Sequence, residues 1–155
     1  MAASVRITGF GNRRDLLDDG ISRYVKLMSP WADLIFDFHK PLSAASASVE
    51  DQLAREEKIL LASIPERSHT ATLWEGGKLM DSRAFASWIG ERMRDGRMPV
   101  FVVGSAQGIS SSFRNKSDSV ISLSPMTMPY KICLQVLTEQ IYRAFTILNG
   151  HPYHK

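Results

Sequence analysis

Short apolar runs and longer segments with helical periodicity alternate along this chain. Runs rich in β-branched and aromatic residues predict strands at residues 5–10, 34–38, 70–73, 99–103 and 120–123. Between them, apolar residues spaced three and four apart predict helices at 15–28, 48–62 and 82–96. This alternation calls for an α/β fold, a three-layer sandwich with a mainly parallel sheet, and periodicity alone favours a plain doubly wound sheet.

Several helix ends carry recognisable sequence features. Ser48 can cap the second helix through its hydroxyl, Ser82 can cap the third, and Gly96 ends the third. The Ala/Ser run at 43–48 is too short to link two domains and is interpreted as a mobile loop. We therefore expect one domain over residues 1–155.

A longer helix is predicted at residues 130–148, where the apolar stripe is broad. Glu139 precedes Arg143 by four residues, which is the favourable order for an ion pair on a helix. Asn149 and Gly150 then end the helix. The stripe is too broad for one sheet face, so we expect burial against a second subunit; it comprises Ile132, Cys133, Val136, Leu137, Ile141, Ala144, Phe145 and Leu148.

Two loops lie on either side of the strand predicted at 120–123. Gly104-Ser-Ala-Gln-Gly108 follows a buried strand, at the edge where open parallel sheets bind ligands. It matches neither G-x-G-x-x-G nor a P-loop, so its two glycines by themselves favour an ordinary turn. Ser124-Pro-Met-Thr-Met-Pro129 contains two prolines, which prevent regular structure, and it is unusually apolar. We expect it to be partly buried or to cover an apolar ligand.

Composition narrows the class of protein. No apolar run reaches the roughly 18 residues of a membrane span, and the N-terminus lacks a signal-peptide layout, so we expect no membrane association and a cytoplasmic location. The single cysteine, Cys133, fits a reducing compartment and is interpreted as a core residue. A net charge of +3 and a pI of about 9.2 are compatible with nucleic-acid binding. Arg92, Arg94 and Arg97 form either a solvated helix end or an RNA contact.

Two kinds of catalysis lack support. His39, His69, His151 and His154 show no metal-ligand spacing with cysteine or carboxylate, so we expect no metal. The serines at 105 and 110–112 lie in no G-x-S-x-G motif, which argues against a serine hydrolase. The terminal His-Pro-Tyr-His-Lys is different: a solvated end is the default, but two imidazoles, a phenol and an ammonium within five residues favour a functional role.

Four motifs together resemble a known family. They are Phe-Val-Val-Gly-x-x-x-Gly at 101–108, Leu-Ser-Pro-Met-Thr-Met-Pro at 123–129, Glu-Gln-Ile-Tyr-Arg-Ala-Phe at 139–145 and the terminal His-Pro-Tyr-His-Lys. This pattern closely resembles the ribosomal RNA large subunit methyltransferase H family of the SPOUT superfamily. Length, strand order and the early Phe10-Gly11 also match. Members of that family are bacterial enzymes that methylate N3 of a pseudouridine in large-subunit ribosomal RNA.

The resemblance implies a fold, a cofactor and partners. SPOUT enzymes are homodimers whose C-terminal segment forms a deep trefoil knot, and they hold S-adenosylmethionine in a bent form where three loops converge. We expect the substrate to be large-subunit rRNA on the assembled ribosome, because one small subunit offers little surface to grip a large RNA. By matching positions, the donor site is expected at Leu73, Gly104, Leu123, Ser124, Pro125, Met126, Thr127 and Met128.

Methyl transfer needs few catalytic side chains, because most of the rate acceleration can come from holding the two substrates in line. The uracil imide must also lose its proton. The candidate catalytic residues are His154 as proton acceptor or relay, Tyr153 to stack on or orient the base, and Arg143 to hold a phosphate or a developing oxyanion. In the family, tail and helix residues of one protomer are thought to complete the site of the other.

Three positions depart from the family pattern. Ser105 stands where a second glycine is usual, Tyr130 where a histidine follows the proline, and Leu134 where an arginine is expected. The donor side therefore matches the family better than the acceptor side. Two hypotheses stay open: an active rRNA methyltransferase, or a non-catalytic or differently specific relative that binds RNA or the ribosome.

Overall fold

The computed structural model describes residues 2–16, 18–42 and 48–155. The strands are β1 (Ala3–Phe10), β2 (Ala32–His39), β3 (Ser68–Leu79), β4 (Met98–Val103) and β5 (Ser119–Ser122). The helices are α1 (Arg13–Leu16), α2 (Asp19–Met28), α3 (Val49–Ser63), α4 (Ser82–Arg94), α5 (Ser111–Lys116) and α6 (Tyr130–Leu148). The strands form one five-stranded sheet in the order β2-β1-β4-β3-β5, and all of these pairings are parallel.

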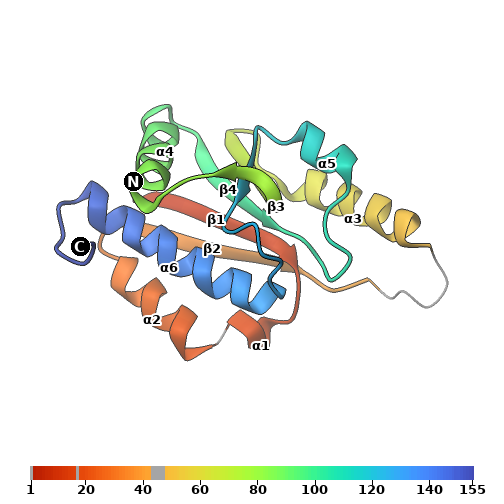
Figure 1. The fold of residues 1–155 in the computed structure, drawn as a ribbon, viewed down its shortest axis with the longest axis horizontal. Coiled ribbons are helices and arrows are strands. Elements are labelled where there is room, and N and C mark those ends of the chain that lie inside the picture. The colour runs from red at the N-terminus through yellow and green to blue at the C-terminus, as the bar shows by residue number, and fades with distance from the viewer. Residues whose placement is uncertain (1, 17, 43–47) are drawn as a thin grey trace.

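Helices cover both faces of the sheet, so neighbouring residues of one strand pack into different cores (Figure 1). Phe101 and Val103 of β4 belong to the larger cluster, which includes α2, α4 and α6. Val102 belongs to the smaller cluster, with Leu60 of α3 and Phe113 of α5. The pleat produces this alternation, and a strand buried on both faces is apolar throughout. The predicted three-layer α/β sandwich is confirmed.

Helix α6 lies lengthwise along the sheet, between α2 and α4 (Figure 1). Leu134, Leu137 and Ile141 on its inner face are fully buried. On another face Ile132 is 51% exposed and Val136 is 36% exposed. These two residues, one helical turn apart, form the outer apolar face of α6. The helix has the predicted bounds, and its stripe extends beyond what the sheet covers.

Strand β3 is longer than predicted. We expected it to end at Leu73, but it continues to Leu79 and pairs with β5 a second time through Lys78 and Leu79, after an irregularity in register. Gly77 permits this, because a Cβ on it would lie 2.7 Å from the Ile121 carbonyl carbon. Close approach of two backbones is therefore the reason that the glycine-rich segment stays in the sheet.

The predicted helix at 15–28 is wrong as a single element, since the chain forms α1 and α2 instead. The Asp18 side chain accepts a hydrogen bond from the Gly20 N–H at 2.8 Å and caps α2. Short polar side chains that bond the nearby backbone compete with helix continuation. Leu17, which falls within that predicted helix, lies outside the described residues.

Other helix ends agree in part with the sequence. Ser48 caps α3 as predicted, accepting from the Asp51 N–H at 3.1 Å. The cap of α4 is Asp81 rather than Ser82, because the Asp81 carboxylate already accepts from the Ala84 N–H at 2.8 Å. Ser82 instead donates to Gln140 of α6 at 2.8 Å. The short helix α5 was missed, since six residues carry too little periodicity.

Some expectations stay predictions. The loop interpreted as mobile at 43–48 falls mostly on 43–47, outside the described residues. The trefoil knot and the single domain come from the resemblance and from chain length. Within the part of the chain that the structure describes, no helix is both long and apolar enough to cross a membrane.

Candidate functional site

The carboxyl ends of β4 and β5, together with β3 at the irregularity that follows Leu73, open onto one cavity of about 740 Å³. Leu73 of β3, the loop 104–108 after β4 and the loop 123–129 after β5 all line it. Parallel strands place their carboxyl ends at one edge of a sheet, where α/β proteins bind ligands. The volume falls in the range of roughly 300–1,000 Å³ that is typical of small-molecule sites.

Seven of the eight residues that the resemblance assigns to the methyl donor line this cavity: Leu73, Gly104, Leu123, Ser124, Met126, Thr127 and Met128. The eighth, Pro125, is not among the lining residues. The Ser124 hydroxyl accepts from the Met126 N–H at 3.0 Å and shapes the loop around this proline. Apolar side chains and loop backbone dominate the lining, which suits a flat aromatic ring with polar edges.

The glycine loop at 104–108 forms a tight turn. The Gly108 N–H donates to the Ser105 carbonyl at 2.9 Å, and Gly108 has a φ of 82°. A Cβ on Gly104 would lie 2.9 Å from the Gly108 carbonyl carbon. Both glycines are thus needed for the turn itself, as the sequence favoured, and the same turn forms one wall of the cavity.

Helix α3 holds this loop from the other face of the sheet. Glu56 is only 3% exposed, and its carboxylate accepts from the Ser105 hydroxyl at 3.0 Å and from the Gln52 amide at 3.0 Å. The space left at this junction is about 10 Å³, room for no more than one water. Ser105, which departs from the family pattern, therefore ties the loop to α3.

A second carboxylate on α3 holds the start of α5. Glu57 accepts hydrogen bonds from Lys116 at 2.6 Å, Ser110 at 2.9 Å and Ser112 at 3.0 Å. These bonds, that of Lys116 first, hold the pKa of Glu57 below its usual value. Ser110 also caps α5 by accepting from the Phe113 N–H at 3.0 Å. Helix α5 is thereby fixed relative to the glycine loop.

The other departures lie next to the cavity or in the core. Tyr130 lines the cavity, and its ring lies against Gly11, where a Cβ would be 3.0 Å away. Leu134 is fully buried, so this position serves the core. The Lys131 ammonium pairs with Asp15 at 2.8 Å. Cys133 lines the cavity, and burial raises the pKa of its thiol to about 11, so the thiol is neutral and a poor nucleophile.

The three candidate catalytic residues meet around Glu139. Tyr153 donates its hydroxyl hydrogen bond to Glu139 at 2.9 Å, and Arg143 Nε donates to the same carboxylate at 3.1 Å. The Arg143 guanidinium also lies 4.8 Å from the centre of the Tyr153 ring. Arg143 Nη1 is 3.3 Å from His154 Nδ1. The predicted Glu139–Arg143 ion pair is confirmed, and the tail is packed rather than loose.

Electrostatics restrict what each group of this cluster can do. The Glu139 hydrogen bond raises the pKa of Arg143, which stays charged. Burial, assisted by hydrogen bonds with Tyr24 and Glu139, raises the pKa of Tyr153, so its phenol keeps its proton. Arginine has only donors, so His154 Nδ1 must accept, which places the proton of a neutral imidazole on Nε2.

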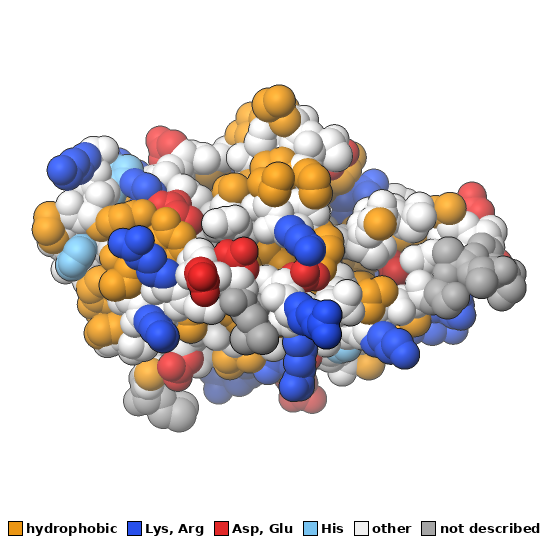
Figure 2. All heavy atoms as spheres, turned by 90° about the horizontal axis from the view of Figure 1, so that it is seen from below, with side chains coloured by type: hydrophobic (Ala, Val, Ile, Leu, Met, Phe, Trp, Pro, Cys, Tyr) orange, Lys and Arg blue, Asp and Glu red, His pale blue; other side chains and the backbone are white. Residues whose placement is uncertain are grey.

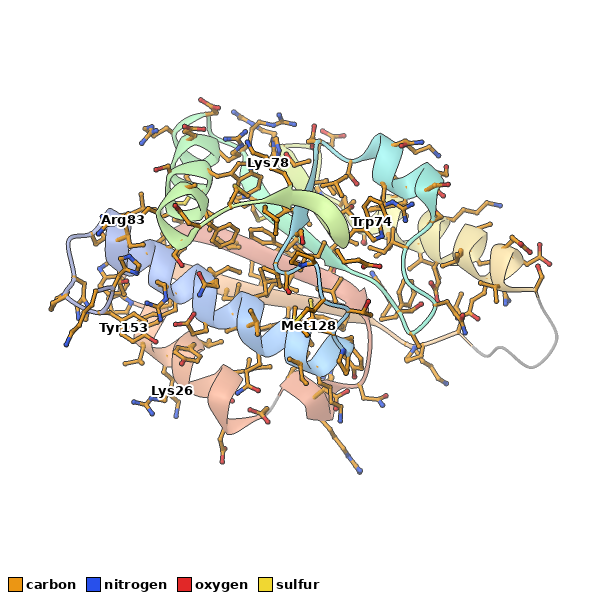
Figure 3. All side chains as sticks on the ribbon, viewed as in Figure 1. Lys26, Trp74, Lys78, Arg83, Met128 and Tyr153 are labelled. Atoms are coloured by element: carbon orange, nitrogen blue, oxygen red, sulfur yellow. The ribbon has the colours of Figure 1, made fainter. Side chains whose placement is uncertain are left out.

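Within one chain, the cavity lies at the start of α6, and the tail cluster, which is Arg143, Tyr153 and His154 around Glu139, lies beside the C-terminal half of this helix. Figure 3 shows Met128 next to the start of this helix, and Tyr153 lies beside its C-terminal half, against Glu139 and Tyr142. Arg143 lies ten positions beyond Cys133, the last residue of α6 that lines the cavity, which is about 15 Å at 1.5 Å per residue. The structure thus brings the donor candidates together and the catalytic candidates together, but keeps the two groups apart.

Sequence reasoning missed several cavity residues, among them Trp74 and Arg114. Trp74 directly follows Leu73, so its neighbour already pointed to it. Arg114 lies on α5, which was not predicted. The basic cluster at 92–97 is partly structural, because Arg97 donates two hydrogen bonds to the Ser68 carbonyl, at 2.8 and 3.1 Å.

Together, the parallel sheet and the cavity at its carboxyl edge define an α/β protein with a small-molecule site. A family model described as "Predicted SPOUT methyltransferase" matches residues 3–154. Proteins named "Ribosomal RNA large subunit methyltransferase H" are 37% identical in Allorhizobium ampelinum, over 94% of this chain and 91% of the relative, and 33% identical in Gluconacetobacter diazotrophicus, over 97% of each.

Solved structures agree in fold. The crystal structure of a probable methyltransferase from Bordetella pertussis matches with a TM-score of 0.57 at 14% identity, covering 92% of this chain and 96% of the other. The chain belongs to the SPOUT methyltransferases, and among them to the family of ribosomal RNA large subunit methyltransferase H. Residues 2–16, 18–42 and 48–155 contain no cluster of three or more His, Cys, Asp or Glu side chains able to hold a metal ion.

Proposed function

We propose that this protein transfers a methyl group from S-adenosylmethionine to N3 of a pseudouridine in large-subunit ribosomal RNA. The observation that carries the proposal is the convergence of Leu73, the glycine loop and the loop 123–129 on one cavity, in a chain whose relatives are named for rRNA methylation. An rRNA substrate would place the protein in the cytoplasm.

The cavity suits S-adenosylmethionine by its chemistry. Leu73, Leu123 and Met128 supply apolar surface for adenine, and the two loops supply backbone amides and carbonyls for its polar edge. When bound, the donor supplies an electrophilic methyl group on a sulfonium. Transfer of that group to N3 would require alignment of the two substrates and loss of the N3 proton, so the chain's own task would be alignment and proton removal.

The site is completed by a second copy of the chain. Within one chain, Arg143, Tyr153 and His154 do not line the cavity, and Arg143 lies about 15 Å along α6 beyond Cys133, the last residue of this helix that does. An antiparallel pairing of two α6 helices would bring the tail of each copy to the cavity of the other. Ile132 and Val136 are exposed on α6 and supply the apolar surface for such a pairing.

In this arrangement each tail residue has a specific task. Arg143 is held by Glu139 and directs its charge toward phosphate or a developing ring oxyanion. Tyr153 stays a neutral phenol, so it orients or stacks on the base rather than accepting a proton. His154 becomes a proton acceptor only when Nδ1 leaves Arg143; otherwise its Nε2–H donates a hydrogen bond.

Recognition of the RNA is expected to rest on the assembled ribosome. On the face shown in Figure 2, basic side chains are spread among acidic ones rather than gathered in one continuous patch. A surface of this kind gives weak nonspecific attraction to nucleic acid. The alternative of a non-catalytic RNA-binding relative relied partly on Leu134, and burial of Leu134 in the core removes that support.

The test is transfer of labelled methyl from S-adenosylmethionine to ribosomes, and separately to deproteinised rRNA, both from cells that lack this gene. We expect label on intact ribosomes at one large-subunit pseudouridine, and little on free rRNA. Absence of transfer to ribosomes by protein that still binds the donor would refute the proposed substrate. Mapping of the label to a carbon or a ribose oxygen would refute the N3 assignment.

A further inference from the structure

The wall of the cavity holds one positive charge in a fixed position. Among the described residues that line it, Arg114 is the only lysine or arginine and Glu75 the only carboxylate. The other lining groups are apolar, hydroxyl, amide or backbone. A single cation in such a lining selects for a ligand with a single matching anion.

The surroundings of Arg114 fix the direction of its guanidinium. Nη1 donates to the Ile109 carbonyl at 2.7 Å, and the guanidinium carbon lies 4.2 Å from the centre of the Trp74 ring. Trp74 comes from β3 and Ile109 from the chain that follows the glycine loop, so two separate segments hold this side chain. Guanidinium groups stack on indole faces while keeping their remaining N–H donors available.

Arg114 has no carboxylate partner within the described part of the chain. No Asp or Glu oxygen of those residues lies within 4.0 Å of its guanidinium nitrogens, whereas Lys116 on the same short helix pairs with Glu57 at 2.6 Å. An arginine has five N–H donors, and the Ile109 carbonyl takes only one. An oriented guanidinium beside a cavity is a receptor for a planar anion such as a carboxylate.

We propose that Arg114, braced on Trp74, binds the α-carboxylate of the methyl donor and thereby selects donors that carry an amino-acid end. This inference rests on the proposed use of S-adenosylmethionine. That donor carries one carboxylate and one ammonium, and the cavity wall carries one guanidinium and one carboxylate. The adenosine end then occupies the apolar loops, and Arg114 makes the site prefer the whole donor over its adenosine part.

The test compares two ligands that share adenosine and a neutral thioether. S-adenosylhomocysteine has the carboxylate, and 5′-methylthioadenosine lacks the amino-acid end. Their dissociation constants are measured by calorimetry on the wild-type protein, on Arg114→Ala and on Arg114→Lys. We expect Arg114→Ala to weaken S-adenosylhomocysteine about tenfold or more and methylthioadenosine less than about twofold, with Arg114→Lys between, because lysine keeps the charge but loses the fork.

The matched control is Arg83→Ala, which removes an exposed arginine on α4, on the opposite side of the view from Trp74 in Figure 3. This substitution should leave the dissociation constants of both ligands unchanged. Equal weakening of both ligands by Arg114→Ala would show that Arg114 only shapes the cavity and would overturn the inference. If Arg114→Ala leaves the binding of both ligands unchanged but weakens binding to the ribosome, Arg114 serves an RNA phosphate, and the inference is overturned as well. A wild-type protein that binds neither ligand would refute the proposed donor as well.

Discussion

At the scale of single residues, side chains that fix the loops matter as much as those that line the cavity. Ser105 shows this, since the sequence identified it only as a missing glycine. The Ser105 hydroxyl donates to Glu56, which lies 49 positions earlier in the chain and on the other face of the sheet. A contact of that separation leaves no trace in local periodicity, so sequence reasoning could not find it.

We predict that Ser105→Ala lowers the free energy of unfolding by about 1–3 kcal/mol, because the buried Glu56 carboxylate loses one of its two hydrogen-bond donors. Binding of S-adenosylhomocysteine should weaken in parallel, since the loop loses its tie. Urea denaturation and calorimetry measure the two effects. Ser111→Ala is the control: Ser111 is exposed, and its change should stay within about 0.5 kcal/mol. Equal effects of the two variants would contradict the role of Ser105.

A buried histidine should make stability depend on pH. His69 is 8% exposed, its Nε2 lies 2.8 Å from the Ser119 hydroxyl, and its ring forms a T-shaped pair with Trp88, with ring centres 5.2 Å apart. Burial lowers the pKa of His69 below its usual 6.5, and Arg92 and Arg97 lower it further against the opposing effect of Asp118. Below about pH 6.5 the unfolded chain therefore binds a proton that the folded chain resists.

We accordingly predict that His69 contributes stability that is complete above about pH 6.5 and is lost as the pH falls toward its folded pKa. Urea denaturation of the wild type between pH 8 and pH 5 should show this decline. His69→Gln should show a flatter profile between pH 6.5 and pH 5, whatever its overall stability. A variant that keeps the full wild-type slope would contradict this assignment.

At the scale of elements, the sequence predicted what local patterns determine. The apolar run of β4 and the stripe of α6 gave the right elements, the latter with its observed bounds. Elements set by distant partners were missed or truncated. The part of β3 beyond Leu73 is a strand because β5 pairs with it at Lys78 and Leu79. The six-residue α5 forms because Phe113 is buried in the smaller core. Neither requirement is visible within the segment itself.

The outer apolar face of α6 leads to a prediction about oligomeric state. Val136→Lys should convert a dimer into a monomer, because a charge in the centre of the pairing surface would have to be desolvated. Sedimentation at micromolar concentration measures this, and the single chain should lose less than about 0.5 kcal/mol of stability. Leu61→Lys is the matched control, since Leu61 is 43% exposed on α3 and belongs to a different surface. A wild-type monomer at this concentration would contradict the pairing.

At the scale of the whole molecule, the fold class and the three-layer arrangement could be predicted, because alternation of strands and helices determines them. The convergence of the donor candidates followed from the resemblance and from the rule that parallel strands end at one edge. The separation of the tail cluster from the cavity was not predicted, although it follows largely from the length of α6, whose bounds the sequence did predict. That separation is the reason for proposing a site shared between two copies.

The most direct measurement of this account is subunit complementation. One variant, Gly104→Val, disrupts the cavity, since a side chain there meets the Gly108 backbone. The other lacks residues 151–155 and so lacks the tail. Each alone should be inactive in methyl transfer to ribosomes. Co-expressed in equal amounts, they should recover roughly a quarter of wild-type turnover, because half of the dimers are mixed and each of those has one intact shared site.

The comparison requires that each of the two variants is folded on its own, which circular dichroism measures. Recovery near a quarter would establish that the cavity of one chain works with the tail of its partner. Activity of the mixture no greater than the sum of the two variants alone would contradict the shared site.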